Sequence, residues 1–95
     1  MSVHLPTTEA RADLELRVPR GEAGSLDEGA RSVLEKVDAV RRVEVERIGG
    51  MRPDAFDLYV EVTADLELEL PDGADPAETL GDGFGVVGVE RCEER

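Results

Sequence analysis

The chain has 95 residues and a formal net charge of −12, with 23 acidic residues against 11 basic ones. This length suits one domain and is too short for two hydrophobic cores. The single cysteine excludes an intramolecular disulfide, and the sequence has no apolar run near the roughly 20 residues of a membrane span. We therefore expect one soluble cytoplasmic domain with no membrane segment.

The charge resembles that of proteins from microbes with a salt-rich cytoplasm, because carboxylates abound and Lys36 is the only lysine. Salt screens repulsion between carboxylates, so low salt should loosen the fold. The acidity is thus predicted to be a halophilic adaptation to the solvent. Residues 1–53 carry a net charge of −1 and residues 54–95 carry −11, a division that adaptation to salt does not require.

Residues 1–11 show no periodicity and are expected to form a flexible N-terminal segment. His4 lies there without a second histidine, which favours an exposed side chain over a metal ligand. Residues 12–92 are predicted to form the single α+β domain, and residues 93–95 a charged C-terminal end.

Residues 12–18 alternate between apolar and charged side chains, which predicts a first strand that ends before Pro19. Ser25 and Glu28 have the spacing of a capping box. Apolar residues then recur at helical spacing, so we predict a helix over residues 26–38.

Residues 40–48 predict a second strand, with Val43 and Val45 directed toward the core. Arg41 and Arg47 share the parity of these valines, and inward-pointing charge protects an edge strand from pairing. Gly49-Gly50 is expected to end the strand, and residues 49–54 to form a loop.

Residues 55–70 carry the longest alternation of the chain, with an apolar side chain at every even position from Phe56 to Leu70. At about 3.3 Å per residue such a strand would reach roughly 53 Å, beyond the usual strand length. We therefore expect a bulge, bend or break near Ala64-Asp65.

Asp75-Pro76-Ala77-Glu78 has the pattern of a helix start. Glycines at 81, 83 and 85 limit that helix to one or two turns, or leave it a loop. Residues 86–91 predict a last strand.

The order of elements resembles that of small regulatory and adaptor modules with a ferredoxin-like βαββαβ plait. The expected fold is α+β, with a four-stranded antiparallel sheet, a short or degenerate second helix, and the first and third strands as a central, parallel pair. The predicted core, one helix against one sheet face, comprises Leu14, Leu16, Leu26, Ala30, Val33, Leu34, Val37, Val43, Val45, Phe56, Leu58, Val60 and Val62.

The other face of the predicted sheet is densely charged. It is expected to carry Asp13, Glu15, Arg17, Arg42, Glu44, Glu46, Asp57, Tyr59, Glu61 and Thr63. Only Tyr59 is aromatic there and the charge is negative, so we expect no binding of nucleic acid.

Catalytic and metal-binding patterns are not found in the sequence. The acidic residues do not have the spacing of a calcium loop, and Cys92 has acidic neighbours and lacks an activating histidine. The glycines of residues 81–85 precede a strand, unlike a dinucleotide-binding loop. We expect no catalytic residue, metal or cofactor, and hence a non-enzymatic protein.

The expected function is that of a protein-binding or assembly module, and the alternative is a small-molecule or metal-sensing regulatory module. The charged face is costly to desolvate, which leaves the sheet edges for a protein partner or a second copy. The candidate edge residues are Phe84, Val86, Val87 and Val89 in the last strand region and Arg41, Arg42 and Arg47 in the second strand. A contact between the arginine-bearing first half and the acidic second half would weaken at high salt, whereas an apolar contact would not.

Overall fold

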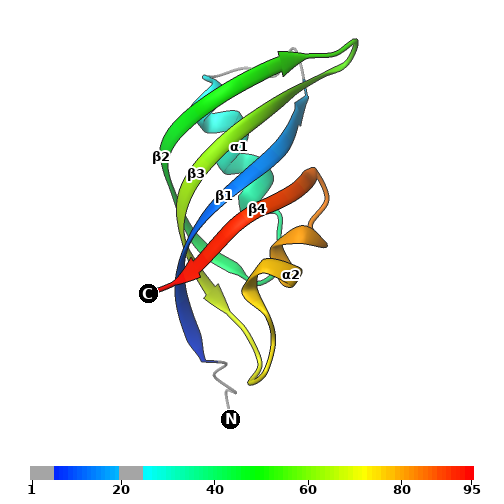
Figure 1. Cartoon of the computed structure of the whole chain (residues 1–95). Helices are drawn as coiled ribbons and strands as arrows, with labels where there is room; N and C mark the ends of the chain where they lie inside the picture. Colours follow the sequence, from blue (N-terminus) through cyan, green and yellow to red (C-terminus); the bar gives the residue numbers. More distant parts are fainter. Residues whose placement is uncertain (1–5, 20–24) are drawn as a thin grey trace.

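The computed structural model describes residues 6–19 and 25–95, so the predictions for His4 and for the loop at residues 20–24 lie outside the described residues. Along the chain, strands and helices follow in the order β-α-β-β-α-β (Figure 1). Their bounds are β1 (Thr7–Pro19), α1 (Leu26–Glu35), β2 (Val40–Pro53), β3 (Asp57–Glu69), α2 (Pro76–Gly81) and β4 (Val86–Glu94).

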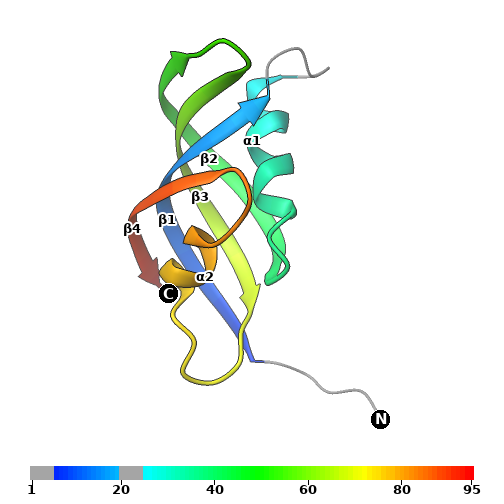
Figure 2. The same ribbon diagram turned by 90° about the vertical axis from the view of Figure 1, so that its right-hand side faces the viewer.

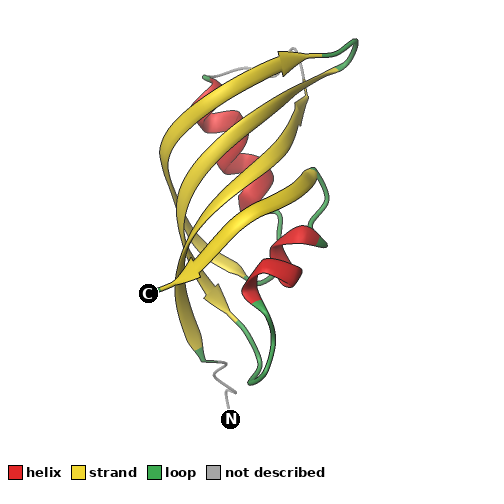
Figure 3. Cartoon of the chain, in the orientation of Figure 1, coloured by secondary structure: helices red, strands yellow, loops and turns green. Residues whose placement is uncertain are grey.

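The four strands form one sheet in the order β2-β3-β1-β4, and every neighbouring pair is antiparallel. Two helices accompany the sheet, which confirms the α+β class (Figure 3). The central pair is β1 and β3, but these strands are antiparallel, so the prediction of a parallel pair is wrong. α1 returns the chain to the other end of the sheet, so β2 runs in the same direction as β1. The hairpin between β2 and β3 then turns the chain, so β3 runs in the opposite direction.

β1 begins at Thr7, five residues before the predicted start. Its early part pairs with the end of β3, where Ala10 lies opposite Leu66. Ala10 and Ala12 are both buried. The long alternation of β3 therefore supplies partners for residues 7–11, and these residues belong to the sheet rather than to a flexible segment.

α1 begins as its capping residues predict, because the Glu28 N–H donates to the Ser25 hydroxyl at 3.2 Å. The helix ends at Glu35, three residues before the predicted end. Turns follow the helix, and in them the Val37 N–H donates a hydrogen bond to the Leu34 carbonyl at 3.1 Å. Val37 still lies in the core.

β2 passes through Gly49-Gly50 and continues to Pro53, so the predicted loop over residues 49–54 is wrong. Pairing with the long β3 sustains the strand there. The hairpin closes at residues 54–56, where the Asp54 N–H donates to the Asp57 carbonyl at 2.8 Å.

β3 is continuous from Asp57 to Glu69 and its register with β1 has no shift, so of the bulge, bend or break expected near Ala64-Asp65, a bulge or a break in β3 is wrong. The irregularities occur in the outer strands instead. One shift lies between Val45 and Arg47, and it places Arg47 opposite Thr63 on the open face rather than on the predicted helix side. Such bulges bend and twist edge strands while a central strand stays regular.

α2 is a short helix, as its glycines predict. Its start is capped by Asp75, whose carboxylate accepts a hydrogen bond from the Ala77 N–H at 3.0 Å. Pro76 and Leu80 are buried and dock this helix on the sheet face that α1 also covers (Figure 2). The core is therefore two helices against one sheet face, rather than one.

Most of the predicted core is buried. Phe56 is the clear exception, since it is 83% exposed in the hairpin turn. Leu26, Val45 and Leu58 are only partly buried. The core also includes residues that were not predicted: Ala10, Ala12, Val18, Val40, Ala64, Leu66, Leu68, Leu70 and Leu80.

Candidate functional site

The outer strands of the sheet are β2 and β4, and the predicted edge residues divide between them (Figure 1). In the last-strand region, Phe84 is 81% exposed and Val87 is 50% exposed. Val86 and Val89 instead pack against the core. Only two of the four apolar candidates are therefore available to a partner.

The three candidate arginines of β2 occupy different positions. Arg41 donates to the Asp38 carbonyl at 2.6 Å and forms an ion pair with Glu69 at 3.2 Å, so it anchors the start of the strand. Arg42 and Arg47 lie opposite Glu67 and Thr63 in the register with β3. Both therefore belong to the open face of the sheet, opposite the face that α1 and α2 cover (Figure 2).

The two edges differ in the sign of their charge. β2 contains four arginines and two glutamates, a net charge of +2. β4 contains three glutamates and one arginine, a net charge of −2, and the neighbouring α2 with its caps adds Asp75, Glu78 and Asp82. The strand order thus places a basic edge and an acidic edge on opposite sides of the sheet.

The open face carries charged side chains of both signs, as predicted. Three of its acidic side chains have partners: Arg95 lies 3.2 Å from Asp65, Arg52 lies 3.8 Å from Glu15, and the Thr63 hydroxyl donates to Asp13 at 2.6 Å. Such exposed pairs each contribute little to stability.

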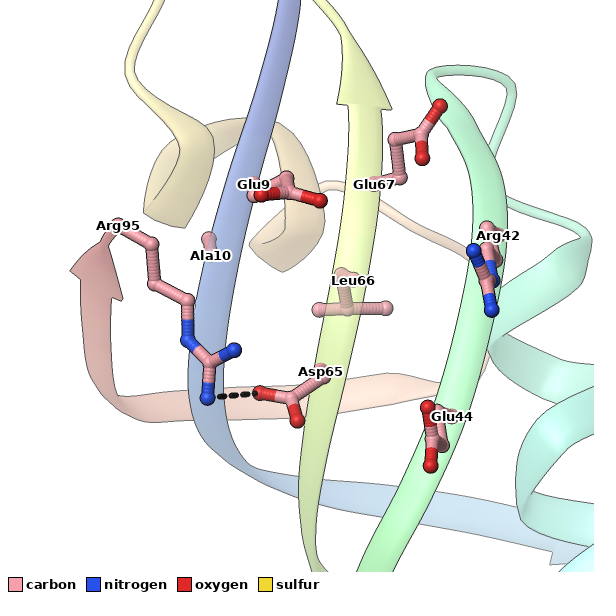
Figure 4. A pocket seen from close by; sticks show the side chains of 8 residues that line it. All are labelled: Glu9, Ala10, Arg42, Glu44, Asp65, Leu66, Glu67 and Arg95. Carbon is pink, nitrogen blue, oxygen red and sulfur yellow. Dashed lines mark ion pairs between the residues drawn. The ribbon is translucent and has the colours of Figure 1, made fainter.

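Several shallow hollows open on this face, and Figure 4 shows a hollow of about 150 Å³. It is lined by Glu9, Ala10, Arg42, Glu44, Asp65, Leu66, Glu67 and Arg95. One Asp65 oxygen is shielded from solvent without an aligned hydrogen bond in the described part of the chain, and the Arg95 guanidinium compensates it as an ion pair.

Beside this cavity, the pKa of Glu46 is raised above its ordinary value of 4.5, first by a hydrogen bond with the Asp65 carboxyl and then by repulsion from that carboxyl. Glu46 nevertheless lies on the surface. The pair therefore lacks the enclosure that normally tunes carboxyls for acid–base catalysis.

Cys92 is half-buried on the helix side of β4, opposite Ala12. Burial raises the pKa of its thiol, and the charges of Asp75 and Glu94 raise it further. These effects favour the neutral thiol over the nucleophilic thiolate.

The glycine-rich turn before β4 serves close packing. Gly85 has a φ of +89°, and a Cβ at Gly83 would lie 2.5 Å from a methyl carbon of Val37.

Within residues 6–19 and 25–95, no group of three or more His, Cys, Asp or Glu side chains is arranged so that it could hold a metal ion. Within the same ranges, neither helix is long and apolar enough to cross a membrane.

Arg52, Tyr59 and Arg17 lie side by side on the open face, in neighbouring positions of β2, β3 and β1. Phe84 lies beyond them in the turn before β4, where it also lines a hollow with residues 36–39 of the turn after α1. The sequence did not predict the contacts among these four side chains. The guanidinium carbon of Arg52 lies 4.9 Å from the centroid of the Tyr59 ring, and that of Arg17 lies 5.4 Å from the centroid of Phe84. Tyr59 and Arg17 are direct partners in the β1–β3 register.

The parity of β1 and β3 was sufficient to place Arg17 and Tyr59 on one face. Arg52 was missed because Gly49-Gly50 was taken to end β2. Phe84 is among the predicted edge residues, but its contact with Arg17 was not predicted, because Phe84 precedes β4, where strand parity does not apply.

Comparison of the chain with protein-family models, with curated proteins and with solved structures finds no match.

Proposed function

We propose that this protein is a non-enzymatic protein-binding or assembly module that acts through the edges of its sheet. The observation that carries this proposal is the opposite charge of the two edges, +2 on β2 and −2 on β4. Unpaired N–H and C=O groups along an edge strand accept a further strand. Complementary charge then favours pairing of the β2 edge of one copy with the β4 edge of another.

The strand directions fit such a contact. β2 and β4 run in opposite directions, because β2 is antiparallel to β3, β3 to β1, and β1 to β4. A β2 edge laid beside a β4 edge of a second copy would thus extend an antiparallel sheet. The two surfaces differ, so the contact is heterologous and leads to rings or chains of copies.

Bulges limit the length of this contact. The β2–β3 pairing has three register shifts, and the β1–β4 pairing has two. Bulges twist an edge away from a flat partner. We therefore propose a short, reversible contact in which Val87, half exposed on β4, supplies apolar area.

We also propose a specific fold type and a salt-rich cytoplasm as the environment of this protein. The element order and the strand order β2-β3-β1-β4 support a ferredoxin-like βαββαβ plait. The net charge of −12 with a single lysine supports a halophilic, cytoplasmic protein. A metal-sensing role would need converging ligands, which the described ranges do not gather.

The test reverses the charge of each edge separately. Arg42→Glu with Arg47→Glu makes the β2 edge acidic, and Glu90→Arg with Glu93→Arg makes the β4 edge basic. Each double variant then has two edges of like charge and should remain monomeric by sedimentation velocity, whereas an equimolar mixture should associate. Phe56→Lys, which adds charge at an exposed turn position, is the control and should associate as the unmodified chain does. Association of either double variant alone, or none in the mixture, would contradict the edge contact.

A further inference from the structure

The charges on the open face follow rows that run across the strands. Because neighbouring strands pair in register, each row takes residues that lie opposite one another on β2, β3, β1 and β4. We use the name charged rows for four consecutive rows, counted from the β2–β3 hairpin. Their formal net charges alternate in sign along the sheet: +2, −2, +1 and −3.

The first two charged rows each contain charges of a single sign. In the first row, Arg52 and Arg17 lie on either side of Tyr59. In the second row, Glu61 and Glu15 are direct partners, and the outer strands contribute only glycines. Two guanidinium groups therefore lie next to two carboxylates along the central strands.

The third and fourth charged rows repeat this alternation with mixed side chains. In the third row, Arg47 and Arg91 lie on the outer strands and Asp13 lies between them. The fourth row has three carboxylates and one guanidinium: Glu44, Asp65, Arg11 and Glu93. Glu46 forms a hydrogen bond with Asp65 and adds a fourth carboxylate.

Several of these charges lack an opposite charge within the single chain. Among the residues that the structure describes, Arg17, Arg47 and Glu61 form no ion pair. Charges of this kind are available to a partner surface, on which opposite charges at matching positions fix the orientation of a complex.

The charged rows do not share the strong acidity of the chain. Together with Glu46 they hold five of the 11 basic residues and seven of the 23 acidic ones, a net charge of −2 out of −12. Contact between two such faces therefore does not oppose two strongly acidic surfaces. Salt screens the repulsion between the remaining parts of the two chains.

We propose that the open face binds the open face of a second copy of this chain in a two-fold symmetric dimer. The order of the charged rows is self-complementary, as a two-fold contact requires. A two-fold axis parallel to the rows, between the second and the third, places the first row of one copy on the fourth row of the other and the second row on the third. Each basic row then meets an acidic row.

The same charges exclude the other simple two-fold arrangement. An axis along the strands would place every row on its own counterpart, and like charges facing each other across an interface are unfavourable. Packed sheets keep their strand directions within about 30° of each other, so the rows of two copies stay roughly aligned.

The cost of removing charged side chains from water makes this dimer reversible rather than tight. It uses the open face, so it is independent of the edge contact proposed above. It also closes at two copies, whereas the edge contact continues to rings or chains.

Cross-linking distinguishes the two contacts. Thr63→Cys in a Cys92→Ala background leaves one thiol per chain, in the third row on the central strand β3. In the face dimer two such thiols lie near the axis, between sheets about 10 Å apart, and bismaleimidoethane should join them. In an edge contact four strand spacings, about 19 Å, would separate them. The matched control is Arg31→Cys in the same background, on the outer face of α1, which should not cross-link.

Charge reversal on the central strands then tests the pairing of rows. Glu15→Arg with Glu61→Arg, added to the Thr63→Cys chain, places a basic second row against the basic third row and leaves both edge strands unchanged. The yield of cross-linked dimer should fall about tenfold or more. Glu35→Arg with Asp72→Arg changes the net charge equally at exposed positions off this face, and it should keep the yield.

Circular dichroism checks that each variant is folded. If the Glu15→Arg, Glu61→Arg chain does not fold, the comparison of Thr63→Cys with Arg31→Cys carries the test. Association without cross-linking at Thr63→Cys would overturn the face dimer and leave the edge contact standing, and a cross-linked mass that stops at two copies would do the reverse. Equal yields from Thr63→Cys and Arg31→Cys, or from the two charge-reversed chains, would also overturn the face dimer.

Discussion

Leu34 and Phe56 are both large apolar side chains that the sequence assigns to the core, yet only one lies there. Leu34 is fully buried on α1, whereas Phe56 is 83% exposed in the β2–β3 turn. Alternation alone indicates which face a strand residue shares. It does not indicate where the strand ends or how far the helices cover it.

This difference in burial predicts that truncating the two side chains will change the free energy of unfolding by very different amounts. Leu34→Ala should lower the free energy of unfolding by about 2–5 kcal/mol, the usual loss for a large-to-small change in a packed core. Phe56→Ala should change it by less than about 0.5 kcal/mol, as at most surface positions. Urea denaturation of both variants measures these losses. Equal losses would contradict the helix phase and the position of the turn.

Glu46 predicts a pH dependence that arises at one residue pair. In the folded chain the pKa of Glu46 is raised above 4.5 by Asp65. The protonated Glu46 side chain therefore stabilises the fold fully below its unfolded pKa of about 4.3, and this stabilisation is lost as the pH rises through the folded pKa. Glutamine cannot ionise, so Glu46→Gln removes the loss of stability that ionised Glu46 causes. The variant should gain stability relative to the unmodified chain at pH 7 but not at pH 4, as measured by urea denaturation at both values. A gain of the same size at both values would contradict the assignment.

At the scale of elements, local patterns predicted the kinds and order of the strands and helices. The helix caps at Ser25 and Asp75 could be predicted from the sequence, because a capping side chain hydrogen-bonds to residues close to it in sequence. The extent of β1 and β2 could not be predicted, because residues 7–11 and Gly49-Gly50 adopt strand conformation through pairing with β3. Such pairing joins residues far apart in the chain, and it overrides weak local propensity.

The candidate surfaces divide in the same way. Sequence parity placed Arg42 on the open face and identified the last strand as an apolar edge. It could not show that Val86 and Val89 turn inward, or that a bulge moves Arg47 to the open face. Bulges follow from the twist of the whole sheet, which a single strand does not encode.

α2 provides a prediction with two readouts, because Asp75 both caps the helix and faces Cys92. Asp75→Ala should destabilise the chain by about 0.5–2 kcal/mol, the usual effect of losing a cap. It should also lower the pKa of the Cys92 thiol, which the Asp75 charge raises, and so speed alkylation by iodoacetamide at a fixed pH. Asp72→Ala, in the preceding exposed turn, is the control. A change in stability without any change in thiol reactivity would contradict the proposed proximity.

At the scale of the whole molecule, we expect the net charge to limit stability. A net charge of −12 on 95 residues makes the compact state repel itself unless salt screens the repulsion. The thermal midpoint should therefore rise as KCl increases from low concentration to the molar range. A midpoint that stays constant would show that the acidity does not limit the fold, and the halophilic interpretation would lose its basis.

The proposed edge contact also belongs to the whole molecule, since it would need both sides of the sheet at once. Light scattering coupled to size-exclusion chromatography, with the unmodified chain at increasing concentration in KCl solutions that keep it folded, tests it most directly. The account predicts a mass that rises with concentration above the 10.3 kDa of one chain, and that rises less at the highest salt, where opposite edge charges are screened. A mass of one chain at every concentration and salt would contradict it.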